Sequence, residues 1–360
     1  MTGTRTPDRP RAAPGDRART GRGEPVSPAR PGLALAMLPG MLPHTFTPAQ
    51  LDRLRRVTRV LSDEPLGSFD GEDARAVLAE VEVLVGHWGC PTLTAEVLDA
   101  APRLRLFAYA AGTVKWQVTE AVFERGIVVT SAAAANAVPV AEYALAMILL
   151  ANKGVLGFRE QLRSGARPPL EATRVGNRDK VVGIVGASHV GRRLVELLRP
   201  FELTVLLYDP YLGPDDARRL GVELVTDLDE LCARADVLSL HAPDVPATRG
   251  MIGAAQLARL RDGATFLNTA RPALVDQEAL LTEARTGRLQ VILDVTDPEP
   301  LPPGHPLLGL PNVFVTPHVA GSMGSELPRM AELAVQEVER FVTGAAPLHP
   351  VRREDLDRIA

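Results

Sequence analysis

The sequence predicts an α/β fold with two doubly wound parallel sheets. Its 360 residues are 46% hydrophobic and 23% charged, which is enough apolar material for two ordinary soluble domains. Short apolar segments alternate with helical segments in two successive series, as in proteins whose parallel strands are joined by crossover helices. The strands of the second series are largely apolar, which indicates that helices cover both faces of their sheet.

The first series begins at residue 31, where the composition changes from Arg and Pro to apolar residues. Apolar segments predict strands at 33–38, 81–86, 103–110 and 124–132. Helices are predicted between them at 48–57 and 94–100. Residues 1–30 hold seven Arg, five Pro and three acidic residues. That composition predicts a disordered tail without the apolar core of a secretory signal.

The second series begins with an apolar segment at residues 138–152, which predicts a buried helix too short to span a bilayer. Strands are predicted at 180–186, 203–209, 235–242, 264–270, 290–295 and 312–317. Helical segments lie between them at 190–201, 215–221 and 254–263. Six strands with crossover helices are typical of a Rossmann-like, dinucleotide-binding sheet. The last amphipathic segment, 325–344, predicts a helix that returns to the first sheet.

The overall charge and the cysteines exclude several classes of protein. A net charge of −4 gives no general attraction for nucleic acid or for an anionic membrane, so neither is an expected partner. Cys90 and Cys232 lack the spacing of metal ligands or of a disulfide framework. We therefore expect no metal site and a reducing, cytoplasmic location.

A glycine-containing turn joins the first predicted strand of the second series to its helix. The segment VGIVGASHVGRRL has Gly186 and Gly191 at the outer positions of a Gly-x-Gly-x-x-Gly fingerprint, with Ser188 in the middle. The backbone amides at the start of the helix attract a pyrophosphate. Asp209 ends the next strand, where a carboxylate receives the ribose hydroxyls and repels the extra phosphate of NADP. The turn predicts NAD binding, although Asp209 would also suit a plain Asp-Pro turn.

Three ionisable residues follow the last three predicted strands. Arg271, Glu299 and His318 come after strands that end at one edge of a parallel sheet, so we expect them in one cleft. Arg can hold a carboxylate through two hydrogen bonds, and His can exchange a proton with a carbonyl oxygen. A carboxylate on the other imidazole nitrogen orients the ring. Each residue also has a plain structural explanation. Arg271 would be a solvated cation, Glu299 would be part of a Pro-rich turn, and His318 would cap a strand.

These segments carry a resemblance to a known family. The motifs NTAR (268–271), DVTDPEPLP (294–302) and TPHVAG (316–321) occur in that order, and the similar stretches span about residues 31–345. The chain resembles the D-isomer-specific 2-hydroxyacid dehydrogenases, which include phosphoglycerate, glycerate and formate dehydrogenases. The resemblance implies NAD-dependent hydride transfer between a small D-2-hydroxy acid and its 2-keto acid. It makes Arg271 the carboxylate clamp, His318 the acid/base and Glu299 its partner.

The resemblance also implies contacts to the cofactor NAD. The candidate cofactor-binding residues are Gly186, Ser188, His189, Val190, Gly191, Asp209, His241, Ala270, Arg271, Asp294 and His318. His189 and Val190 meet the pyrophosphate, and Asp294 meets the nicotinamide carboxamide. The candidate substrate-binding residues are His87, Trp88, Gly112, Thr113, Lys115 and Arg271. His87 and Trp88 are candidates because they follow a predicted strand, and they either line the cleft or belong to a plain turn.

The family architecture makes the substrate domain discontinuous. It comprises residues 31–133, completed by 319–348, and the NAD-binding domain comprises 134–318, with 349–360 as a C-terminal tail. The active site lies in the cleft between these two Rossmann-like domains. Family members pair as homodimers through the helix that matches 138–152.

Three positions depart from the family pattern. Ser188 replaces the middle glycine of the fingerprint, and Pro272 replaces the glycine after the arginine, where it biases Arg271 toward an extended backbone. Val114 and Lys115 replace the usual Asp-Asn of the substrate loop, so the substrate stays open. Lys115 either contacts an anionic distal group of the substrate or is a surface lysine.

Other functions also stay open. A formate- or phosphite-like dehydrogenase would use the same chemistry on a small oxyanion. An NAD-sensing co-regulator would keep the fold and recruit proteins, which the basic tail favours and the Arg–Glu–His set disfavours. A methyltransferase would use a glycine loop but leaves the Arg–Glu–His placement unexplained.

Overall fold

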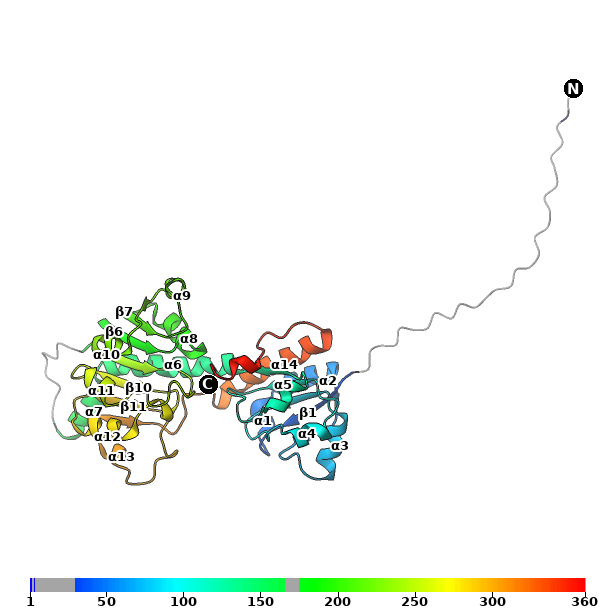
Figure 1. Cartoon of the computed structure of the whole chain (residues 1–360), viewed down its shortest axis with the longest axis horizontal. Coiled ribbons are helices and arrows are strands. Elements are labelled where there is room, and N and C mark those ends of the chain that lie inside the picture. Colours follow the sequence, from blue (N-terminus) through cyan, green and yellow to red (C-terminus); the bar gives the residue numbers. More distant parts are fainter. Residues whose placement is uncertain (2, 4–29, 166–174, 360) are drawn as a thin grey trace.

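The structure, a computed structural model, describes residues 1, 3, 30–165 and 175–359. The predicted tail over residues 1–30 lies outside this part of the chain, apart from residues 1, 3 and 30. Two all-parallel sheets form two lobes (Figure 1). The predicted α/β fold with two doubly wound sheets is confirmed.

The first sheet has the strand order β2-β1-β3-β4-β5. Its strands are β1 (Gly32–Ala36), β2 (Arg59–Val60), β3 (Val83–Gly86), β4 (Leu106–Tyr109) and β5 (Val128–Ser131). The helices of this lobe are α1 (Leu42–Thr45), α2 (Pro48–Val57), α3 (Glu72–Glu80), α4 (Ala95–Ala100) and α5 (Glu120–Glu124). Successive residues of β1 enter two different cores, so both faces of the sheet are buried as a doubly wound sheet requires. The edge strand β2 was not predicted, because two residues leave no periodic pattern.

The second sheet has the strand order β12-β11-β10-β9-β6-β7-β8. Its strands are β6 (Arg178–Val185), β7 (Glu202–Tyr208), β8 (Glu223–Leu224), β9 (Val237–Leu240), β10 (Thr265–Asn268), β11 (Gln290–Leu293) and β12 (Val313–Val315). Its helices are α7 (Val155–Arg163), α8 (His189–Leu198), α9 (Pro214–Leu220), α10 (Leu228–Arg234), α11 (Ala254–Arg259), α12 (Gln277–Arg285) and α13 (Pro306–Gly309). All six predicted strands are present, and the short edge strand β8 makes a seventh.

Helix α6 (Ala133–Asn152) follows the first sheet and packs on the second lobe. It is 20 residues long, because the alanine-rich residues before 138 are also helical. The prediction that this segment is too short to span a bilayer was therefore wrong: by length and composition alone, α6 is the one helix among the described residues that could. Ala141, Ala144 and Ile148 are nevertheless fully buried against α8 and the second sheet, as in a helix of a protein core.

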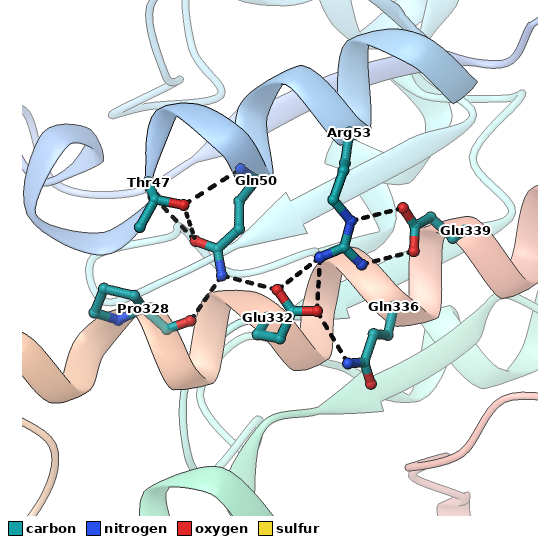
Figure 2. Close-up of polar contacts among 7 residues, drawn as sticks. All are labelled: Thr47, Gln50, Arg53, Pro328, Glu332, Gln336 and Glu339. Atoms are coloured by element: carbon teal, nitrogen blue, oxygen red, sulfur yellow. Dashed lines mark hydrogen bonds and ion pairs between the residues drawn. The ribbon is translucent and has the colours of Figure 1, made fainter.

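Helix α14 (Leu327–Thr343) returns to the first sheet, as predicted, and packs its buried residues against β1 and β4. Charged side chains fasten it to α2, as Figure 2 shows. The guanidinium of Arg53 donates to both carboxylate oxygens of Glu339, at 2.9 and 2.7 Å, and to Glu332 at 2.7 Å. Gln50 also donates to Glu332, at 3.1 Å. These hydrogen bonds attach a C-terminal helix to an N-terminal one, so the first lobe is discontinuous in sequence.

Candidate active site

The strand order of the second sheet reverses beside β6. β7 and β8 lie on one side of β6, whereas β9 to β12 lie on the other. In an open parallel sheet, the carboxyl ends of the strands at such a reversal form a crevice that binds ligands. A cavity of about 510 Å³ opens there. We call it the β6–β9 cavity, and its walls include Ser188, His189, Val190, Arg192, His241 and Ala270.

The turn after β6 has room only for glycine at two positions. Gly186 has φ = +99°, and a Cβ atom there would lie 2.6 Å from the backbone nitrogen of Ala242, after β9. A Cβ atom on Gly191 would overlap the carbonyl oxygen of Gly186. Ser188 is the N-cap of α8, because its Oγ accepts from the backbone N–H of Gly191 at 3.4 Å. The serine at the middle position therefore fits the turn by capping the helix.

Two polar residues lie next to this turn, at the ends of neighbouring strands. Asp209, at the end of β7, accepts from the backbone N–H of Ala187 at 2.7 Å and from that of Tyr211 at 2.8 Å. His241, after β9, is buried with its ring 2.8 Å from Ser239 Oγ. Burial lowers the pKa of His241 to about 3, so its imidazole is neutral. Asp209 lies where the sequence predicts the ribose carboxylate, and it also fixes the backbone of the turn.

Arg271 follows β10 and lines both the β6–β9 cavity and a second cavity beside it. Its backbone is extended (φ = −144°, ψ = 144°), which is the conformation that Pro272 predicts. Its Nη1 donates to the carbonyl of Ala270 at 2.7 Å. Burial lowers the pKa of the guanidinium from its usual value, while the charges of Asp244 and Glu299 act in the opposite direction.

His318 follows β12, and its ring reaches the Pro-rich segment after β11. Its Nδ1 lies 2.5 Å from Oε1 of Glu299. The backbone of His318 is in the left-handed region, with φ = +54°, which a non-glycine residue rarely adopts. The half-exposed imidazole lines the second cavity, of about 650 Å³, together with Arg271. We call this the His318 cavity.

Asp294, at the end of β11, holds the loop that carries His318. Its buried carboxylate accepts from Thr316 Oγ1 at 2.6 Å and from the backbone N–H groups of Val319 and Ala320, both at 2.9 Å. Its own backbone carbonyl accepts from the N–H of His318 at 2.9 Å. Asp294 therefore fixes the unusual backbone of His318 from both sides.

Comparisons with known proteins show which family the chain belongs to. Residues 145–320 match the family model described as D-isomer specific 2-hydroxyacid dehydrogenase, NAD binding domain. A glyoxylate reductase of Korarchaeum cryptofilum is 35% identical over 268 residues, which cover 73% of this chain and 80% of that protein. The chain belongs to the D-isomer-specific 2-hydroxyacid dehydrogenase family. The resemblance seen in the sequence is thereby confirmed.

Other relatives of this dehydrogenase family member differ in length. A D-3-phosphoglycerate dehydrogenase of Methanocaldococcus jannaschii is 30% identical over 298 residues, which cover 82% of this chain and 56% of that protein. The chain thus spans about half the length of the curated phosphoglycerate dehydrogenases that it matches. The crystal structure of the TT0316 protein from Thermus thermophilus has a TM-score of 0.69 at 32% identity, covering 89% of this chain and all of that one.

The cofactor of this dehydrogenase family member is NAD(H), since the matched segment is the NAD-binding domain of the family. The turn after β6 fits a pyrophosphate, because the two glycine positions leave a cradle that side chains would fill. The backbone amides of His189 and Val190 lie at the start of α8, where the helix dipole favours an anion. The side-chain oxygen of Ser188 faces the helix and leaves that cradle open.

The first lobe brings some of its predicted residues to the cavities. Gly112 and Thr113 line both of them, and Trp88 lines the His318 cavity. Lys115 is not among the residues that line either cavity; its Nζ donates to the backbone carbonyl of Asp244 at 3.2 Å, across the two lobes. Burial lowers the pKa of Lys115, and the charge of Asp244 opposes that shift. Its predicted contact with an anionic group of the substrate stays a prediction.

His87 is not among the residues that line either cavity. Its side chain is fully buried, its ring stands edge-on to Trp88 at 4.7 Å, and neither ring nitrogen has a hydrogen-bond partner among the described residues. Burial lowers the pKa of His87 to about 4. Its predicted contact with the substrate also stays a prediction.

Sequence reasoning missed several residues at these cavities. Trp116, Gln117 and Ser322 line the His318 cavity, and Asn136 lines both cavities. Trp116 directly follows Lys115, and its type alone could have marked it, since the chain has two Trp residues. Residues 348–351, together with Asp355, Arg358 and Ile359, line the β6–β9 cavity. The segment predicted as a C-terminal tail therefore borders the cofactor site.

Proposed function

We propose that this chain is an NAD-dependent dehydrogenase that interconverts a D-2-hydroxy acid and its 2-keto acid. The proposal rests above all on the 2.5 Å contact between His318 Nδ1 and Glu299 Oε1, beside a cavity that Arg271 also lines. The nucleotide turn lies at the same edge of the sheet, so that the cofactor and these side chains would meet in one cleft.

In this proposal, Arg271 holds the carboxylate of the substrate. Its hydrogen bond to Ala270 occupies one N–H group and leaves others for a two-pronged hydrogen bond. In the part of the chain that the structure describes, Arg271 forms no ion pair, so its charge is available to an anionic substrate. Holding the carboxylate fixes the position of the neighbouring carbonyl carbon.

His318 exchanges the proton. Glu299 accepts the hydrogen bond from Nδ1–H, which fixes the tautomer and leaves Nε2 for the substrate oxygen. In reduction, Nε2–H gives its proton to the carbonyl oxygen, and Glu299 then faces the neutral ring; in oxidation, Nε2 takes the proton and Glu299 stabilises the imidazolium. NAD(H), when bound, supplies or accepts the hydride. Asp294 keeps the His318 loop in place, and it would also accept a hydrogen bond from the nicotinamide carboxamide when NAD(H) is bound.

NADH oxidation with a panel of 2-keto acids tests this function. The panel contains glyoxylate, hydroxypyruvate, pyruvate, oxaloacetate, phosphohydroxypyruvate and phenylpyruvate. We expect turnover of at least one acid, and a loss of about 10³-fold or more in kcat in His318→Ala with little change in NADH affinity by calorimetry. Full activity of His318→Ala would remove the assigned acid/base. A further assay offers formate and phosphite together with NAD⁺. If the protein binds NADH but turns over none of these substrates, the NAD-sensing co-regulator is favoured.

The assembly, domain limits and location belong to the same proposal. The dehydrogenase pairs as a homodimer through α6, on which Leu150 is exposed, and light scattering with a Leu150→Glu variant tests this. Its substrate domain comprises residues 31–133 and 319–348, and its NAD-binding domain 134–318. A cytoplasmic location suits Cys90 and Cys232, which are free, buried thiols whose pKa burial raises to about 12.

A further inference from the structure

We infer that the natural substrate carries a bulky, uncharged aromatic side chain, of the phenylpyruvate and D-phenyllactate class. This inference rests on the proposed function. It adds the kind of side chain that the His318 cavity binds next to the keto and carboxylate groups of the substrate. The phosphate-bearing substrate that the names of several relatives indicate would be excluded.

The chain's two tryptophans gather at this one cavity. Trp88 follows β3 and Trp116 follows β4, and both line the His318 cavity with the apolar residues Tyr109, Met323 and Leu327. Trp116 is 76% exposed and Trp88 is 37% exposed. Large exposed aromatic side chains around a cavity are typical of a binding surface that a flat apolar group would cover.

The two loops that carry the tryptophans are joined to each other. Thr92 Oγ1, in the loop after Trp88, donates to the backbone carbonyl of Trp116 at 2.8 Å. The N–H of Leu93 donates to the carbonyl of Gln117 at 2.8 Å. On the other side, the N–H of Leu38 donates to the carbonyl of Trp88 at 2.9 Å. The backbone of both loops is thus held in place, so a ligand that binds between the tryptophans does not have to order this backbone.

The charge of the cavity selects against a second anionic group. Arg271 is the one permanently cationic side chain among the described residues that line it, and the substrate carboxylate requires that charge. Lys115 is turned toward Asp244, and the carboxylate of Asp294 would repel an anion. Apart from His318, the other polar side chains of the wall are neutral hydroxyls and amides, namely Tyr109, Thr113, Gln117, Asn136, Thr269 and Ser322. A phosphate in this cavity would therefore lie near neutral and apolar groups without a partner charge.

Steady-state kinetics with NADH test the inference, with glyoxylate as the reference acid because it has no side chain. We expect kcat/KM for phenylpyruvate to exceed that for phosphohydroxypyruvate by about 100-fold. In Trp116→Ala and in Trp88→Ala, the phenylpyruvate-to-glyoxylate ratio of kcat/KM falls about tenfold, and Trp116→Phe restores most of it. Leu162→Ala, an exposed apolar residue of α7 away from the cavity, is the matched control and leaves the ratio unchanged.

Tryptophan fluorescence gives a readout that does not need turnover. Because the only two tryptophans of the chain line the cavity, their emission reports its occupancy directly. In the His318→Ala variant with NAD⁺, we expect D-phenyllactate to change the emission at concentrations about 100-fold lower than D-3-phosphoglycerate does.

The outcomes separate the inference from the proposed function. If the protein reduces glyoxylate and its kcat/KM for phosphohydroxypyruvate or oxaloacetate equals or exceeds that for phenylpyruvate, the inference is overturned. The proposed dehydrogenase function then still stands. No turnover of any acid overturns the proposed function. In that case the fluorescence titration tests the aromatic site by itself. If D-3-phosphoglycerate binds as tightly as D-phenyllactate or more tightly, the inference of an aromatic site is overturned as well.

Discussion

At the scale of single residues, the position of His318 depends on Asp294. The carboxylate receives three hydrogen bonds from the loop, of 2.6 to 2.9 Å, and both oxygens take part. In Asp294→Asn, the amide NH₂ faces a donor, so one hydrogen bond is lost and the loop shifts. We expect kcat to fall about 100-fold, while KM for the keto acid changes far less, because Arg271 still binds the carboxylate.

Steady-state kinetics over a range of keto acid concentrations check this prediction. Asp63→Asn, which alters an exposed carboxylate of the first lobe, is the control for the substitution itself. If Asp294→Asn lowers the melting temperature but keeps kcat, the carboxylate stabilises the fold without positioning His318.

His87 makes the stability of the protein depend on pH. Its pKa is lowered by burial to about 4, whereas an unfolded chain has a histidine pKa of about 6.5. Between these values the unfolded state binds a proton that the folded state does not, so stability falls as the pH falls from about 6.5 to 4. The loss amounts to about 3 kcal/mol from this residue.

Urea unfolding at pH 7 and pH 4.5 measures this loss. We expect His87→Leu to remove part of the difference between the two pH values, while His44→Leu, on an exposed histidine of α1, leaves it as it is. The remaining difference belongs partly to His241, whose pKa burial also lowers. An unchanged difference in His87→Leu would show that His87 gains a proton or a partner in the folded state.

At the scale of elements, the turn between β6 and α8 depends on the end of β7. Asp209 accepts a hydrogen bond from Ala187 N–H, which holds the turn. Its charge has a separate effect, on the preference between NADH and NADPH. Asp209→Asn keeps an acceptor for the turn but removes the charge that would repel the 2′-phosphate of NADPH. We expect the NADPH-to-NADH ratio of kcat/KM to rise about tenfold. Asp209→Ala should raise it too and also weaken binding of both cofactors, which calorimetry would show; no change in the ratio contradicts the ribose assignment.

The pairing of α2 with α14 closes the first lobe. Arg53 bonds to Glu332 and Glu339, and these hydrogen bonds raise the pKa of the guanidinium, with Glu339 contributing most. Arg53→Ala leaves two carboxylates on α14 without their cation. We expect the free energy of unfolding to fall by about 2 kcal/mol in urea titrations. Arg56→Ala, on the exposed side of α2, should change it by much less.

The elements that sequence analysis predicted are those with a local pattern. The apolar strands β1, β3, β6 and β10 and the helix α2 lie where the sequence indicates them. The edge strands β2 and β8 have two residues each, too few for a period. Nor does the sequence mark the start of α6, because Pro139 is typical of the first turn of a helix and rare in its interior, whereas the helix begins six residues earlier, at Ala133. Such features depend on tertiary packing.

The same limit applies to the site. Arg271, Glu299 and His318 were predictable because each comes three to six residues after the end of a strand of one parallel sheet. The role of Asp294 as the anchor of the His318 loop was not, since it depends on hydrogen bonds to a segment 22 to 26 residues further on. Trp116 was overlooked because its neighbour Lys115 has a charge that suggested a contact with an anionic substrate. The side chain of Lys115 instead donates a hydrogen bond to Asp244 of the other lobe.

At the scale of the whole molecule, the C-terminal segment joins the two lobes along the cofactor cleft. The N–H of Val351 donates to the carbonyl of Val129 in β5 at 2.8 Å, which attaches the segment to the first sheet. Further on, the guanidinium of Arg358 lies over the ring of Tyr211, 5.2 Å from its centroid, just after β7 of the second sheet. Between these contacts the segment lines the β6–β9 cavity.

This arrangement predicts that Arg358 and Tyr211 act as a pair in cofactor binding. The stacked contact keeps the segment along the cavity, so Arg358→Ala and Tyr211→Ala should each raise the Kd for NADH about threefold, as expected for an exposed cation–π contact. Because either substitution alone removes the whole contact, the double variant should bind NADH no more weakly than the single ones. Calorimetric titrations of the four proteins close the cycle. Effects that multiply would mean that the two side chains act independently, and that the segment lies beside the cofactor without holding the lobes around it.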